Sequence, residues 1–221
     1  MNFIWVTLGL SVLISNPVLA APQCSDLEAQ WNSHYVSDFK IDWDTSNFTC
    51  PGGESSLAMA FFDLANMTFR ANKDGYRPDF YALVKGLVRK VHFDPDCKYL
   101  ALGHRGQGKI TLCNPFFKDS REDRASTLVH ETRHLQSGDP AHAQCVGGKY
   151  NGKAGACDDT FYDGSWNGSG FNADIFFYSW NMNGAEKNEL SRAVMQSEMN
   201  TMIPDRFNHI TGEQTKKWRG N

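Results

Sequence analysis

The sequence lacks the features that would mark a membrane-spanning, nucleic-acid-binding or fibrous protein. Its longest apolar run is the twelve residues Phe3 to Ile14, and no run reaches the roughly eighteen that a membrane-spanning helix needs. Positive charge is not in excess, because 22 Lys and Arg residues are set against 25 Asp and Glu residues. A composition of 41% hydrophobic and 21% charged residues excludes a collagen, a coiled coil or bulk disorder. The 221 residues contain no repeat and no linker, which predicts one domain with a substantial core.

The apolar run at the N-terminus predicts a signal peptide. The run is too short to span a bilayer comfortably, Pro17 interrupts it, and Val18 and Ala20 place small residues at positions −3 and −1 of a cleavage site. We therefore expect residues 1–20 to be a signal peptide and 21–221 to be a single domain, secreted or periplasmic. An uncleaved anchor is the alternative, because the α-amine is the only positive charge before the run.

No two cysteines have the Cys-x-x-Cys spacing of a cysteine zinc site, so disulfides are the better interpretation. All six cysteines lie beyond residue 20, an even number that an oxidising compartment would pair. Apolar segments at 99–102 and 109–112 are joined by Gly-His-Arg-Gly-Gln-Gly, which predicts a β-hairpin that brings Cys97 opposite Cys113. Closeness in sequence then suggests the pairs Cys24–Cys50 and Cys145–Cys157.

Hydrophobic periodicity predicts a mainly helical α+β fold with a small β-hairpin or sheet, stabilised by disulfides. The predicted helices cover residues 55–70, 79–90, 120–137 and 185–203, the last of which should end before Pro204. Residues 145–173 are rich in Gly, Asn, Asp and Ser and predict a long loop that a disulfide keeps ordered. The aromatic segment 174–181 fits either a strand or a helix.

Residues 130 to 134 read His-Glu-Thr-Arg-His and carry the main functional signal. On a helix, His130 and His134 lie one turn apart, on the face opposite Leu128 and Leu135, and should look into a cleft. Two imidazoles at this spacing are what Zn²⁺ accepts from a single helix, and Glu131 beside them is placed to act as a base toward water. A solvated helix face with two surface histidines is the alternative interpretation.

Two stretches, Ile110-Thr-Leu-Cys-Asn-Pro-Phe-Phe117 and Thr127-Leu-Val-His-Glu-Thr-Arg-His134, resemble the zincin metallopeptidases and most closely the deuterolysin-like aspzincins. The resemblance covers residues 109–139. It implies a zincin-like fold and a zinc endopeptidase in which His130 and His134 bind the metal and Glu131 is the general base. Aspzincins take an aspartate ligand from a following Gly-Thr-x-x-Asp segment, whereas this sequence has Gly-Asp-Pro-Ala-His at 138–142.

The third metal ligand is open, because a catalytic zinc takes three protein ligands and the motif supplies two. His142 is the preferred candidate: it follows His134 by eight residues, beyond a Gly/Pro turn, and neutral imidazole is a common zinc ligand. Asp174, in the aromatic segment, is the main alternative. The weaker candidates are Asp139, Glu186 and Glu189.

These residues predict a secreted Zn²⁺-dependent endopeptidase with a protein or peptide substrate and no nucleic-acid or membrane partner in its mature form. A phenol could help zinc to stabilise the oxyanion, and the candidates are Tyr150, Tyr162 and Tyr178. One alternative is a zinc hydrolase acting on cell-wall or other amide substrates. Another is a non-catalytic secreted protein with a degenerate zincin fold, against which the intact Glu131 argues.

Overall fold

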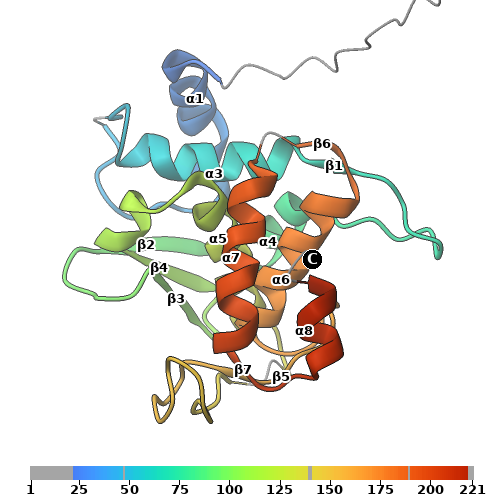
Figure 1. The fold of residues 1–221 in the computed structure, drawn as a ribbon. Coiled ribbons are helices and arrows are strands. Elements are labelled where there is room, and N and C mark those ends of the chain that lie inside the picture. Colours follow the sequence, from blue (N-terminus) through green and yellow to red (C-terminus); the bar gives the residue numbers. More distant parts are fainter. Residues whose placement is uncertain (1–21, 47, 139–140, 189, 219–221) are drawn as a thin grey trace, which may run out of the picture.

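The computed structural model describes residues 22–46, 48–138, 141–188 and 190–218 (Figure 1), and it has the expected α+β architecture with more helix than strand. The helical elements are α1 (Cys24–Gln30), the π-helical segment Trp31–Tyr35, α2 (Val36–Asp38), α3 (Glu54–Asn66), α4 (Phe80–Leu87), the 3-10 segment Asn114–Lys118, α5 (Arg121–Leu135), α6 (Gly170–Asn183), α7 (Arg192–Asp205) and α8 (Gly212–Trp218). The strands are β1 (Thr68–Phe69), β2 (Lys90–Asp94), β3 (Ala101–His104), β4 (Lys109–Cys113), β5 (Asp158–Thr160), β6 (Ala185–Lys187) and β7 (Phe207–His209).

The largest sheet has three strands in the order β2-β4-β3. Strands β3 and β4 form the predicted hairpin, in which Ala101 pairs with Leu112 and His104 with Lys109. Strand β2 was not predicted, because the apolar pattern of α4 was extended to residue 90; the helix ends at Leu87 and β2 then pairs in parallel with β4. This order leaves β3 at an edge of the sheet, against helix α5.

Helix α5 lies in the centre of the molecule, packed against α3, α4, α6 and β3 (Figure 1). Leu128 and Val129 are completely buried. Aromatic rings fill much of the surrounding core: Phe39 stacks on Phe61 at 4.0 Å, and Phe80 meets Phe177 edge to face at 5.1 Å. Each such buried side chain stabilises the fold by about 1.5–3 kcal/mol, so α5 has a rigid setting on which a site can be built.

The three disulfides join Cys24 to Cys50, Cys97 to Cys113 and Cys145 to Cys157, as predicted. The Cys97–Cys113 disulfide does not join opposite residues of the hairpin, as was expected, because Cys97 lies in the connection from β2 to β3. Three disulfides indicate an extracellular or otherwise oxidising compartment. Among the described residues, no helix combines the length and the apolar character required to cross a membrane. The predicted signal peptide, residues 1–20, lies outside the described residues.

The predicted helix over 185–203 is wrong in its first part. Residues 185–187 form β6, which pairs with β1, so tertiary pairing overrides the local helical pattern. Helix α7 begins after Ser191, whose hydroxyl accepts a hydrogen bond from the Val194 N–H, and it continues past the predicted stop to Asp205. The predicted 55–70 helix likewise ends at Asn66, and Thr68 and Phe69 form strand β1. The ambiguous aromatic segment is helical and belongs to α6.

Candidate metal centre

Helix α5 places the two motif histidines one turn apart, as the spacing predicts. Its N-terminus is capped by Ser120, whose side chain accepts a hydrogen bond from the Asp123 N–H, and the helix ends at Leu135. His130 and His134 line a cleft of about 1010 Å³, and Glu131 lines it beside them. The helix therefore presents both imidazoles and the carboxylate to the same space.

His142 completes a group of three histidines. Its Nε2 atom lies 3.1 Å from Nε2 of His130 and 3.0 Å from Nε2 of His134, and one ligand atom from each residue falls within 4.8 Å of the others. A tetrahedral zinc with Zn–N bonds of about 2.0–2.1 Å separates its ligand nitrogens by roughly 3.3 Å, close to these values. The three residues thus form a group that could hold a metal ion.

Asp174, the main alternative ligand, has a different place. Its Oδ2 atom accepts a hydrogen bond from Nδ1 of His130 at 2.7 Å, and its Oδ1 atom accepts one from the Ser126 hydroxyl. It orients a histidine and does not belong to the group of three. Among the weaker candidates, Glu186 is exposed on β6, while Asp139 and Glu189 lie outside the described residues.

Asp158, which the sequence did not single out, orients His142 in the same way that Asp174 orients His130. Its Oδ1 atom accepts a hydrogen bond from Nδ1 of His142 at 2.8 Å. Its Oδ2 atom accepts two more, from the backbone N–H and side-chain amide of Asn172 at 2.9 and 2.8 Å. The only signal in the sequence is a carboxylate directly after Cys157, which no spacing rule singles out.

The hydrogen-bond pattern of the histidines suits a cation. Because carboxylates accept from Nδ1 of His130 and His142, the Nε2 atoms of both rings face inward, where either a proton or a metal ion must lie between them. Burial alone would lower the pKa of His130, but the Asp174 carboxylate outweighs it and raises that pKa to about 9. At His142 burial dominates and the pKa is lowered. Burial would raise the pKa of Asp158, but the hydrogen bond from His142 lowers it, so this carboxylate stays ionised.

Glu131 is held by the edge strand β3. The Gly103 N–H donates to its Oε2 atom at 2.6 Å, and the side chain is buried next to the histidines. A Cβ atom at position 103 would lie 2.5 Å from the Glu131 carbonyl oxygen, so only glycine allows the strand to come this close to the helix. Strand and helix together fix the orientation of the carboxylate.

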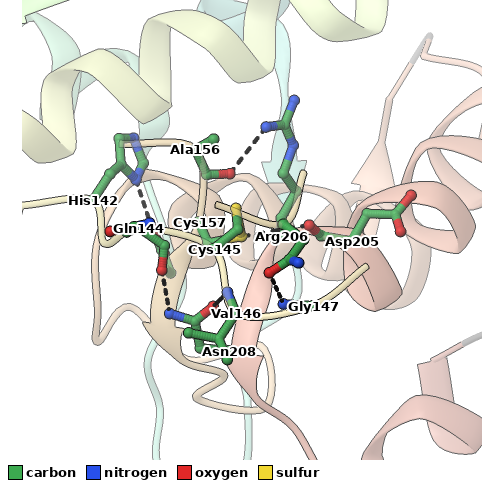
Figure 2. Close-up of a disulfide and its surroundings, with 12 residues drawn as sticks. His142, Gln144, Cys145, Val146, Gly147, Ala156, Cys157, Asp205, Arg206 and Asn208 are labelled. Carbon is green, nitrogen blue, oxygen red and sulfur yellow. Dashed lines mark hydrogen bonds and ion pairs between the residues drawn. A yellow bond between two sulfur atoms is a disulfide. The ribbon is translucent and has the colours of Figure 1, made fainter. Parts of the chain in front are cut away.

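The loop from 141 to 158 holds His142, and its anchor is a disulfide (Figure 2). Ala143 and Cys157 exchange two backbone hydrogen bonds, of 2.6 and 3.2 Å, directly beside the Cys145–Cys157 bridge. The Asn208 side chain donates to the Gln144 carbonyl and accepts from the Val146 N–H, which ties the loop to the far end of the chain. The predicted loop over 145–173 is confirmed in part: its internal disulfide forms, but residues 158–160 are strand β5 and helix α6 begins at Gly170.

The three candidate tyrosines are differently placed. Tyr178 and Tyr150 line the cleft, whereas Tyr162 is 44% exposed and is not among the lining residues. The Tyr178 hydroxyl donates to Asp123 at 2.7 Å, and burial together with nearby carboxylates raises its pKa well above the ordinary value. Tyr178 is therefore committed to a structural hydrogen bond.

Comparison of the chain with protein-family models, with curated proteins and with solved structures finds no match. The residues of the site are therefore the basis for inferring a function.

Proposed function

We propose that the protein is a secreted zinc-dependent endopeptidase. The observation that carries the proposal is the convergence of three imidazole Nε2 atoms on one wall of a large cleft, with a buried carboxylate beside them. Three nitrogen ligands with room for a fourth, non-protein ligand are the donor set of a catalytic zinc site. The proposal agrees with the resemblance of residues 109–139 to the zincins, with His142 in place of the aspartate of the aspzincins.

His130, His134 and His142 would hold the zinc ion. When bound, zinc supplies Lewis acidity to a carbonyl oxygen and to the attacking water. Glu131 would take the proton of that water on Oε1, because Oε2 is engaged by the Gly103 N–H, and would pass it to the leaving amine. Asp174 and Asp158 would keep the Nδ1 protons of His130 and His142 in place, so that both Nε2 atoms stay free to coordinate.

The wall formed by β3 favours a peptide as the substrate. Strand β3 is at the edge of its sheet, and the cleft runs along it. Tyr99, Leu100 and Leu102 are exposed there at 65%, 38% and 36%, which provides apolar contacts beside an edge strand. An extended peptide can lie along such an edge and bury its side chains against such residues.

The test combines metal analysis with digestion of two substrates. Purified wild-type protein should contain one zinc per chain and cleave casein, and the Glu131→Gln and Glu131→Ala variants should keep the zinc but lose at least about a hundredfold in rate. Stoichiometric zinc without cleavage of casein would overturn the endopeptidase. Digestion of peptidoglycan alone would support the alternative of a cell-wall hydrolase, and a wild type that binds no zinc would overturn both.

A further inference from the structure

Three positively charged side chains gather around one tyrosine on the loop side of the cleft. The Cζ atom of Arg206 lies 3.6 Å from the centroid of the Tyr150 ring, and the Nζ atoms of Lys149 and Lys153 lie 5.3 and 5.4 Å from it. All four residues line the cleft that contains the three histidines. The cluster therefore faces the space in which a substrate of the candidate metal centre would lie.

Arg206 is held in place before any ligand arrives. Its guanidinium also lies 4.8 Å from the centroid of Phe171, and its Nη1 atom donates to the Ala156 carbonyl at 2.9 Å (Figure 2). The Phe171 ring is in turn 4.6 Å from the ring of His142. One aromatic ring thus separates the guanidinium from a candidate metal ligand. A guanidinium fixed by stacking loses little conformational entropy when it binds a carboxylate.

These cations form no ion pair with a carboxylate in the described part of the chain. Asp205 also lines this wall, but its Oδ1 atom accepts from the backbone N–H of Lys149 at 3.5 Å. The other acidic lining residues are Glu131 and Asp174 beside the histidines, Asp119 and Asp123 near the start of α5, and Glu198 two turns back along α7. Burial and the nearby aspartates raise the pKa of one of them, Glu198. Acidic side chains therefore gather at the histidines and toward the start of α5, whereas the three cations lie at the loop end of the cleft.

We propose that Arg206, Lys149 and Lys153 form a subsite for a carboxylate of the substrate. The carboxylate would belong either to an acidic side chain near the cleaved bond or to the C-terminus of a peptide. This inference rests on the proposed peptidase function and specifies its substrate class. Arg206 would make the directed hydrogen bonds, and the two lysines, both exposed, would attract the anion and add less to its affinity.

The test measures binding of labelled, acetylated heptapeptides to zinc-loaded protein that carries Glu131→Ala, so that no peptide is cleaved. One glutamate is moved through the heptapeptide, each peptide has a glutamine counterpart, and each is made with a free and with an amidated C-terminus. We expect a preference of about tenfold for the carboxylate at one position, either internal or terminal, which identifies its source.

The preference should disappear in Arg206→Gln and fall about threefold in Lys149→Gln/Lys153→Gln. The second variant alters only exposed side chains, so it remains informative if the first folds poorly. Lys73→Gln/Lys216→Gln, which changes two exposed lysines outside the cleft, is the matched control. Equal binding of both members of every pair, or a preference that survives in all variants, would overturn the subsite while casein cleavage by the wild type still supports the peptidase. Absence of both peptide binding and casein cleavage would overturn the proposed function itself.

Discussion

The candidate metal centre has two halves that are built in different ways. One half is helix α5, where His130 and His134 meet because the helical repeat places every fourth residue on the same side. The other half is the loop from 141 to 158, where His142 is placed by a backbone bridge, a disulfide and Asp158. The helical half is encoded within five residues, and the loop half depends on contacts across the whole C-terminal part of the chain.

The same type of ligand thus has very different structural support in the two halves. An α-helix packed in an aromatic core holds its side chains even when one neighbour is changed. A loop has no repeating hydrogen bonds of its own, so each of its few anchors carries a larger share of the geometry. The loop half should therefore be the easier half to disturb without unfolding the protein.

Removal of any one of the three histidines should have the largest effect. His130→Ala, His134→Ala and His142→Ala should each weaken zinc binding by more than about a hundredfold, because two imidazoles do not make a stable site. Competition with a chromophoric chelator measures the affinity. His209→Ala is the control, since this histidine is 73% exposed on its side chain and lies outside the group. If His142→Ala kept wild-type affinity while Asp174→Ala lost it, the third ligand would be Asp174 and not His142.

Removing each of two disulfides in turn should lower the stability in both cases but weaken zinc binding in only one. In the chain-entropy model, removing either disulfide lowers the free energy of unfolding by about 3 kcal/mol. The loss should be slightly larger for Cys24–Cys50, whose cysteines are 26 residues apart, than for Cys145–Cys157, whose cysteines are 12 residues apart. Cys145→Ala/Cys157→Ala should nevertheless weaken zinc binding by about thirtyfold, because it frees His142, whereas Cys24→Ala/Cys50→Ala should leave the affinity unchanged.

Urea unfolding and zinc titration of both double variants provide the two measurements. An equal loss of affinity in both would mean that zinc binding follows global stability, and the special role of the loop disulfide would be refuted. Unchanged affinity in Cys145→Ala/Cys157→Ala would show that the backbone bridge at Ala143 holds His142 without the disulfide.

The two halves also differ in how far the sequence predicts them. The α5 motif, its Ser120 cap and the β3–β4 hairpin were predictable because each depends on residues close in the sequence. His142 was only a preferred candidate, because a turn that leads a chain back toward a metal has no periodic signature. Asp158 was not predicted, since its role exists only after the loop has folded onto α6. The strand β6 was missed for a similar reason: its partner lies more than a hundred residues earlier.

The carboxylates behind the histidines should have smaller effects that again differ between the halves. Asp158→Asn should weaken zinc binding by roughly 10–100-fold, because Asp158 holds the Nδ1 proton of His142 and the loop has few other anchors. Asp174→Asn should cost less, about tenfold or below, because helix α5 itself orients His130. Isothermal titration of both variants with zinc measures the two losses of affinity, which can then be compared. A larger loss in Asp174→Asn would show that the helix does not hold His130 without its carboxylate partner.

The smallest effect should come from Ser126→Ala, which lies one step further from the metal. Ser126 is buried and its hydroxyl donates to Asp174, so its removal leaves the Oδ1 atom of that carboxylate without this donor. We expect a loss of about 1 kcal/mol in the free energy of unfolding and only about threefold in zinc affinity. Ser37→Ala removes an exposed hydroxyl that donates to a backbone carbonyl, and it should change neither quantity. A tenfold loss of affinity in Ser126→Ala would mean that α5 alone does not fix His130, and that both halves of the centre depend on chains of hydrogen bonds.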